Sequence, residues 1–286
     1  MAPPKIRVLM TSLALVRAAT ITAGAAAPAQ SAAATAPVVV SISKTRVVTM
    51  PVTVQPGITE FSVTSAAKGG SAFQLVLPAA GYTPEKAAAD IEKGLEQGKS
   101  GPLKRFEANV SLRGGMTADD TADSLVVDLE AGTYWALDTN TNKPGKFFAF
   151  TVTGVETGNV LPAATTIKAK QDSKWSGSPK SIPNKGMLNF KNTSSNNHFI
   201  VMVKLNKGKT FQDFKKWFLN PEGPGGPPPV NFDIGIDSGV VSPGYSAAFN
   251  YRLPKGDYVM LCFWPDAEMG GMSHALMGMH RPITLQ

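Results

Sequence analysis

The residues of this chain that could hold a soft metal ion are concentrated in one segment. The sequence YVMLCFWPDAEMGGMSHALMGMHRPITL, residues 258–285, contains the only cysteine, two of the three histidines and five of the 11 methionines. Cysteine and methionine are also ordinary core residues, so the segment could be a packed domain end or a metal site. A single cysteine excludes an intramolecular disulfide, so the thiol of Cys262 needs another explanation.

The candidate ligands define the class of metal. Cys262 offers a thiolate, His198 and His274 offer imidazoles, and Met279 offers a thioether. This soft to borderline set suits copper in either oxidation state and is unsuited to magnesium or calcium. Zinc accepts cysteine and histidine but seldom takes a thioether. A trigonal site of two histidines and one cysteine, with a weak axial methionine, is the arrangement of electron-transfer copper. Met277 and His280 stay outside the predicted site.

An internal comparison indicates that the site occurs in one half of the chain. LEAGTYWALD, residues 129–138, aligns without a gap on LPKGDYVMLC, residues 253–262, and AFQLVLPAAGYT from Ala72 aligns on HFIVMVKLNKGKT from His198 with one insertion. Such self-similarity predicts two copies of one module. Ala72 and Asp138 occupy the positions of His198 and Cys262. Because the candidate ligands are missing together from the first copy, they are predicted to form one site in the second.

Each copy continues into a predicted helix. In the first, Thr83 is the expected N-cap, Pro84 takes the first helical position, and the helix ends at Gly98. Its apolar stripe consists of Ala88, Ile91 and Leu95. The second helix starts at Thr210, with Asp213 three residues later completing a capping pattern. Its buried face is predicted to hold Phe214, Trp217 and Phe218.

The rest of each copy consists of short β-rich runs separated by Gly, Pro and Asn turns, for example at 47–54, 59–64, 124–129 and 186–190. This pattern predicts two β-sandwiches. We expect a first domain over 37–156, without metal ligands, and a second over 170–286, with the candidate site. A polar stretch near 157–174 is the predicted boundary, after which Trp175 could pack back on a domain.

The C-terminal segment resembles the copper loop of cupredoxins, the blue copper proteins of the plastocyanin and azurin group. The shared pattern is Y-x-x-x-C followed by P, then H-x-x-x-G-M-x-x-x-[IV]-T, and it is filled here by Tyr258, Cys262, Pro265, His274, Gly278, Met279, Ile283 and Thr284. The stretch NTSSNNHFIVMV resembles the earlier cupredoxin histidine region and contains His198. Eleven residues separate Cys262 from His274, more than in small cupredoxins.

The resemblance implies an all-β fold of two tandem Greek-key β-sandwich domains, each with one short inserted helix. It further implies one copper ion in the second domain, with nitrogen ligands from His198 and His274, a thiolate from Cys262 and an axial sulfur from Met279. The implied function is single-electron transfer or copper handling with a protein partner that exchanges electrons or copper.

The N-terminal residues predict export. Residues 1–29 carry Lys5 and Arg7, a short apolar run and the cleavage-like triplet from Ala27 to Ala29, as in a signal peptide. Arg17 is the third and last charged residue of this stretch, so a net charge of +7 leaves +4 for the remainder. That charge is too small to predict nucleic-acid binding. We expect an extracytoplasmic protein, secreted or periplasmic, without a stable membrane span once the signal is removed.

Two other function classes remain open at this point. Tandem cupredoxin domains also build multicopper oxidases and copper nitrite reductases, but those enzymes need several further histidines and this chain has three in all. We therefore expect no enzyme. A metal-free binding or structural module on the same sandwich is the alternative, because the first copy shows that the module exists without the ligands.

Overall fold

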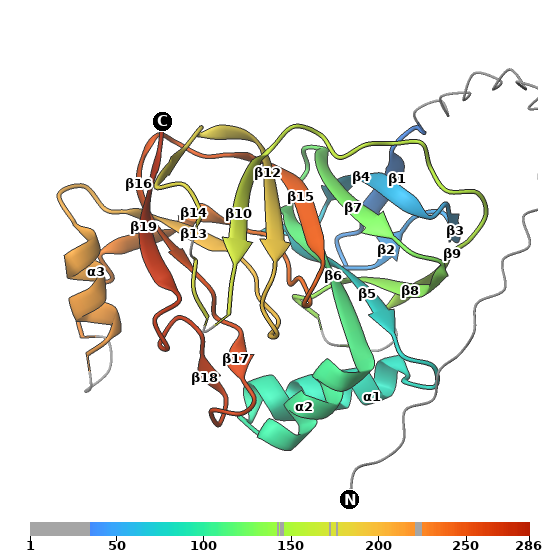
Figure 1. The fold of residues 1–286 in the computed structure, drawn as a ribbon, viewed down its shortest axis with the longest axis horizontal. Coiled ribbons are helices and arrows are strands. Elements are labelled where there is room, and N and C mark those ends of the chain that lie inside the picture. Colours follow the sequence, from blue (N-terminus) through green and yellow to red (C-terminus); the bar gives the residue numbers. More distant parts are fainter. Residues whose placement is uncertain (1–34, 142, 144–145, 172, 176, 221–224) are drawn as a thin grey trace, which may run out of the picture. The chain divides into compact units, whose positions relative to one another are not determined.

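Strands dominate the part of the chain that the computed structural model describes, residues 35–286 apart from 142, 144–145, 172, 176 and 221–224. The predicted signal peptide, residues 1–29, lies outside the described residues. Seven strands form one long sheet (Figure 1) in the order β10 (Thr165–Ala169), β12 (Lys185–Asn192), β15 (Ser246–Arg252), β7 (Asp123–Leu129), β4 (Gly57–Ser65), β1 (Val38–Ile42) and β2 (Val48–Thr49).

Two five-stranded sheets supply the second layers. The first half has β3 (Thr53–Val54), β9 (Phe148–Val152), β8 (Gly132–Asp138), β5 (Ser71–Pro78) and β6 (Val110–Ala118). The second half has β11 (Ser181–Ile182), β19 (His280–Leu285), β16 (Gly256–Leu261), β13 (Val201–Leu205) and β14 (Val230–Asp237). A short hairpin pairs β17 (Pro265–Asp266) with β18 (Met272–Ser273).

The two halves pair their strands in the same way. In the first half β1 runs parallel to β4 and β4 runs antiparallel to β7, and in the second half β10, β12 and β15 have the same pairings. Likewise β8 lies between β5 and β9, as β16 lies between β13 and β19. Apolar side chains of the long sheet and of both five-stranded sheets share a core. The predicted all-β class with sandwich architecture is confirmed.

The helices differ in part from the prediction. Helix α1 (Pro84–Ile91) begins after Thr83, whose side chain accepts the N–H of Lys86, and α3 (Phe211–Phe218) begins with the predicted capping box. A π-helical turn (Glu92–Glu96) and α2 (Ser100–Asn109) follow α1, where the sequence predicted a single helix ending at Gly98. Pro102 does not prevent α2, because it lies in the first turn, where no backbone N–H is needed. None of the helices in the described ranges is long and apolar enough to span a membrane.

The long sheet joins the two halves into one compact unit. Strand β7 of the first half pairs antiparallel with β15 of the second, with Val127 opposite Ala247. The backbones of β6 and β15 approach so closely that a Cβ atom on Gly114 would lie 2.3 Å from the Cβ of Ala247. Gly114 also has φ +100°, a conformation that side chains rarely adopt.

The range predicted as the domain boundary, 157–174, contains strand β10. Because β10 runs parallel to β12, the chain enters the sheet of the second half before residue 170. Trp175 follows and is only 5% exposed, and its indole N–H donates to the carbonyl of Met279 at 3.2 Å. The end of the segment between the halves is therefore packed onto the second half, while its start at Thr157 and Asn159 bonds Ile58 of the first half.

The junction can be tested with a matched pair of glycines. Gly114→Ala should lower the free energy of unfolding by about 2 kcal/mol more than Gly154→Ala, because overpacking a core typically costs about 1–3 kcal/mol. Gly154 has nearly the same backbone angle, φ +106°, but nothing lies within 4 Å of its added Cβ. Urea denaturation of both variants measures the difference. Equal destabilisation would show that the two halves are not in close contact at Gly114.

Candidate metal centre

Cys262 directly follows β16 and is positioned by the strand pairing at the end of β16. It follows Leu261, which pairs with Val201 on β13 and with His280 on β19. The backbone N–H of Cys262 donates to the carbonyl of Met279 at 3.2 Å. Its side chain is fully buried. The thiol is therefore held at the end of a central strand, away from water.

The long loop after Cys262 is ordered by the β17–β18 hairpin. Pro265 pairs with Ser273, and Asp266 with Met272, so most of the eleven residues between Cys262 and His274 are folded into this hairpin. The N–H of His274 then donates to the carbonyl of Trp264 at 2.9 Å. The hairpin thus returns His274 to the position of Cys262 despite their separation in sequence.

His198 is fixed by the segment that connects β14 to β15. Its backbone N–H donates to the carbonyl of Val241 at 3.2 Å, and its carbonyl accepts the N–H of Val241 at 2.8 Å. Residues 238–242, which we call the connecting strap, also bond the first half: the N–H of Gly114 donates to Val240, and the N–H of Ser242 donates to Leu112. Both halves therefore position His198.

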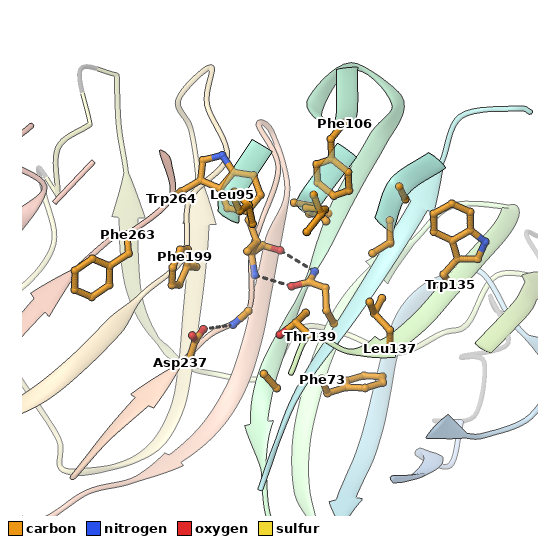
Figure 2. Close-up of a pocket in the computed structure, with 18 of the residues that line it drawn as sticks. Phe73, Leu95, Phe106, Trp135, Leu137, Thr139, Phe199, Asp237, Phe263 and Trp264 are labelled. Atoms are coloured by element: carbon orange, nitrogen blue, oxygen red, sulfur yellow. Dashed lines mark hydrogen bonds between the residues drawn. The ribbon is translucent and has the colours of Figure 1, made fainter. Parts of the chain in front are cut away.

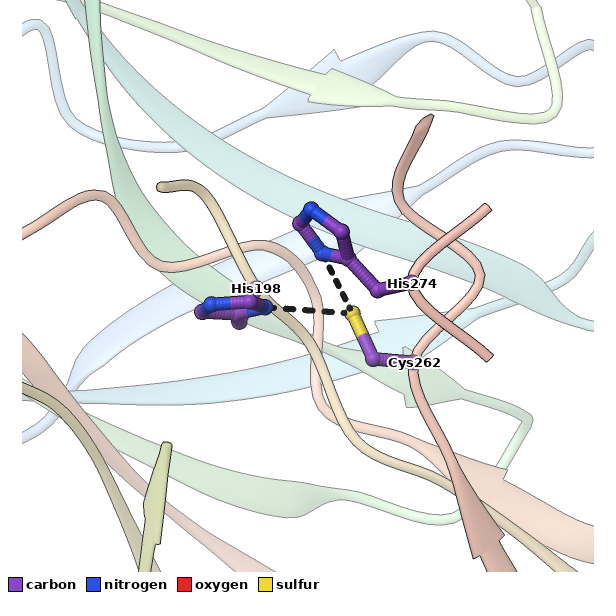
Figure 3. Close-up of side chains that lie close together, drawn as sticks. All are labelled: His198, Cys262 and His274. Atoms are coloured by element: carbon purple, nitrogen blue, oxygen red, sulfur yellow. Dashed lines mark hydrogen bonds between the residues drawn. The ribbon is translucent and has the colours of Figure 1, made fainter. Parts of the chain in front are cut away.

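Three of the four predicted ligands, His198, Cys262 and His274, converge, as Figure 3 shows. Nδ1 of His198 lies 3.5 Å from the sulfur of Cys262, and Nδ1 of His274 lies 3.7 Å from it. One ligand atom from each residue fits within 4.8 Å of the others. A metal ion in the plane of one sulfur and two nitrogens, at zinc-like bond lengths of about 2.3 and 2.0 Å, would separate the sulfur from each nitrogen by about 3.7 Å. Both sulfur–nitrogen distances fit a trigonal site.

Burial keeps all three groups uncharged in the absence of a cation. It lowers the pKa of His198 from 6.5 to about 3, with a further decrease from the nearby His274, and lowers the pKa of His274 to about 4. Burial raises the pKa of the Cys262 thiol to about 12. Both His Nε2 atoms are buried without a hydrogen-bond partner. Neutral imidazoles are the form that binds metals, and a bound cation would offset the cost of ionising the thiol.

Two backbone groups partly offset the effect of burial on the pKa of the Cys262 thiol. The N–H groups of Phe199 and Trp264 donate to the sulfur of Cys262 and lower its pKa, opposing the larger effect of burial. Phe199 follows His198 directly, and Trp264 is two residues after Cys262. The segments before β13 and after β16 that supply His198 and Cys262 therefore also supply the donors to the sulfur. Sequence reasoning missed both donors, because backbone groups leave no residue-type signal.

Met279 lies next to the cluster through its main chain. It is fully buried, its N–H donates to the carbonyl of His274 at 2.8 Å, and its carbonyl accepts from Cys262. Its role as an axial ligand stays a prediction. His280, left out of the predicted site, points elsewhere, with its ring against Phe211, Phe214 and Phe218.

Helix α2 of the first half covers the loop between Cys262 and His274. The indole N–H of Trp264 donates to the Glu107 carboxylate at 2.7 Å, and Lys104 forms an ion pair with Glu268 at 2.7 Å. The Asn197 side chain also bonds Glu107, and burial raises the pKa of that carboxyl. Figure 1 shows α2 beside the β17–β18 hairpin. This cover was not predicted from the sequence, because α2 itself was not predicted.

In the first half, the residue aligned with Cys262 is Asp138, and it forms an ion pair. Asp138 is fully buried, and its carboxylate bonds Arg46 at 2.5 Å. It also accepts the backbone N–H of Ala72, the residue aligned with His198, at 3.0 Å. Where the second half has three neutral groups of types that can bind a metal, the first has a carboxylate paired with an arginine.

Neither a protein family nor a curated protein matches the sequence. Among solved structures, auracyanin B is 20% identical, with 45% of this chain and 92% of that chain covered and a TM-score of 0.28. A reduced auracyanin from Roseiflexus castenholzii is 24% identical, with 44% and 99% covered and a TM-score of 0.27.

A copper nitrite reductase from Nitrosomonas europaea is 12% identical, with 89% and 92% covered and a TM-score of 0.23. At these TM-scores the superposition is loose, so the chemistry of the site must follow from the chain's own residues. The cupredoxin resemblance stated from the sequence agrees with the sandwich fold and with the cluster of His198, Cys262 and His274.

The buried imidazoles predict acid sensitivity of the metal-free protein. Protons bind the unfolded histidines below about pH 6.5 but the folded ones only near pH 3 to 4, so stability falls as the pH decreases from 7.5 to 5.5. Each histidine should account for about 1.4 kcal/mol of the loss at pH 5.5. Urea unfolding at both pH values measures the loss, and His198→Gln should reduce it by about that amount.

His280→Gln is the control for this experiment, because it removes the imidazole that lies outside the cluster. If His198→Gln changed the loss no more than His280→Gln does, the cluster would not be buried in solution.

Proposed function

We propose that this chain binds one copper ion through His198, Cys262 and His274 and uses it to carry single electrons. The observation that carries the proposal is the convergence of both Nδ1 atoms on one buried sulfur at 3.5 and 3.7 Å. A thiol and two imidazoles in this arrangement are the donor set of electron-transfer copper.

The chain's own residues would have three tasks. His198 and His274 supply neutral nitrogen donors, and Cys262 supplies a thiolate stabilised by the N–H groups of Phe199 and Trp264. Bound copper would alternate between Cu(II) and Cu(I) by taking up and releasing one electron. Met279 would supply a fourth, weakly bound sulfur ligand, which would tune the reduction potential.

The rigidity of the surroundings favours electron transfer over copper exchange. Each ligand residue is held by backbone hydrogen bonds: Cys262 to Met279, His198 to Val241 of the connecting strap, and His274 to Trp264 and Met279. All three are fully buried, so water is kept from the metal. A site that holds the same ligands in both oxidation states needs little rearrangement when an electron moves.

The composition argues against an oxidase or reductase built from several coppers. The chain has three histidines, and two of them belong to the proposed site. We further propose that the first half serves as scaffold, that the protein acts outside the cytoplasm, and that a redox protein is its partner. Its residue types and modest net charge give no reason to propose nucleic-acid binding.

The proposal is tested by adding Cu(II) to the purified full chain and recording visible and electron paramagnetic resonance spectra. An intense thiolate-to-copper band with narrow copper hyperfine splitting is expected, and Cys262→Ser should abolish both. Met279→Leu should keep the band and raise the reduction potential, because the axial bond is weak.

His280→Gln is the matched control, since it removes a histidine that does not face the sulfur. It should keep the full spectrum. A colourless protein would refute electron transfer. Tight Cu(I) binding by that colourless protein would then indicate a copper carrier, and no binding of either ion would indicate a metal-free binding module.

A further inference from the structure

A cavity of about 520 Å³ lies between the two halves, beside the metal centre. Small-molecule sites typically occupy about 300–1,000 Å³ and often lie where domains meet. Figure 2 shows its walls: Phe199, Phe263 and Trp264 come from the second half, and Phe73, Trp135 and Leu137 from the first. Phe199 and Trp264 are the two residues whose N–H groups bond the sulfur of Cys262. The cavity therefore borders the metal centre without including its ligands.

The apolar stripe of helix α1 and the π-helical turn faces this cavity. The sequence predicted this stripe at Ala88, Ile91 and Leu95, and all three residues line the cavity while being partly buried or exposed. Leu95 is 40% exposed, so the cavity reaches solvent near the π-helical turn. An apolar helix face that lines a cavity with access to solvent is suited to an apolar guest.

Asp237 is the charged residue among the described residues that line the cavity. One carboxylate oxygen accepts the N–H of Gly239 at 2.8 Å, and no described group donates to the other. The amide of Gln74, by contrast, is fully engaged with backbone groups, including both polar groups of Val240. Asp237 therefore offers a free charged acceptor, and no basic residue among the described residues lines the cavity to hold an anion.

Burial in these surroundings raises the pKa of Asp237 to about 6. The same burial disfavours a second charged group in the cavity, because few polar atoms are available to solvate it. A hydroxyl group can donate to the carboxylate without bringing a charge of its own. Hydrogen bonds of this kind are short and stronger than those between neutral groups.

We propose that the cavity binds a small uncharged aromatic molecule carrying a hydroxyl group. The ring would lie against the apolar walls formed by helix α1 and the aromatic side chains, and the hydroxyl would donate to the free oxygen of Asp237. This inference does not depend on the proposed function, since none of these contacts involves the metal.

The test uses 2-naphthol and its methyl ether, 2-methoxynaphthalene, which has the same ring but no hydrogen to donate. Both are titrated into the metal-free full chain, and binding is followed by the fluorescence of the naphthyl group. We expect 2-naphthol to bind at least tenfold more tightly than the ether, as for one hydrogen bond to a charged group. Asp237→Asn should remove this preference and leave binding of the ether unchanged.

A second pair of variants tests the location. Ala88→Phe fills the cavity and should weaken 2-naphthol binding at least tenfold, whereas Ala89→Phe makes the same change at the exposed neighbouring position and should not. If Ala88→Phe fails to fold, Ile91→Trp fills the same space from a partly buried position.

The proposal is overturned if 2-naphthol does not bind at millimolar concentration, if the ether binds equally well, or if filling the cavity has no effect. Preferential binding of the protonated amine 2-(aminomethyl)naphthalene would also contradict it, because the site would then select a cation. Copper spectra of the same variants are read separately, so failure here is distinguishable from failure of the proposed copper site.

Discussion

The burial of one thiol and two imidazoles at a single point is the constraint on which the rest of this structure depends. These groups lose their hydration, and both Nε2 atoms remain without a hydrogen-bond partner, which disfavours folding unless the surrounding structure compensates. The compensation is a set of backbone hydrogen bonds at Cys262, His198 and His274 together with the large shared core. A bound cation would add further stability, because binding to the folded state alone favours that state.

The first half stabilises this cluster through residues that are not themselves candidate ligands. Its β6 bonds the connecting strap, which in turn bonds His198, and its helix α2 holds Trp264 through Glu107. At its own equivalent position the first half has Asp138, neutralised by Arg46. The same pairing of strands therefore carries a balanced ion pair in one half and a candidate metal centre in the other. We regard the first half as the part that fixes and covers the site.

The ligand cluster and the starts of two helices were predictable from the sequence, because side-chain chemistry and repeated patterns indicate them. The ligand cluster followed from residue types and from the comparison of the two copies, and the helix starts at Thr83 and Thr210 followed from capping patterns. The long sheet shared by both halves was not predictable, because strand pairing between β7 and β15 depends on contacts distant in sequence. Helix α2 was missed because its Gly and Pro lie in the first turn, where they are tolerated.

X-ray absorption at the copper edge, recorded for the Cu(II) and Cu(I) forms of the full chain, tests the central claim most directly. A preformed, buried site predicts one short bond to sulfur and two bonds to imidazole nitrogen in both oxidation states, with little change in distance between them. A first shell without a short sulfur bond, or one that gains or loses ligands on reduction, would contradict a rigid site formed by His198, Cys262 and His274.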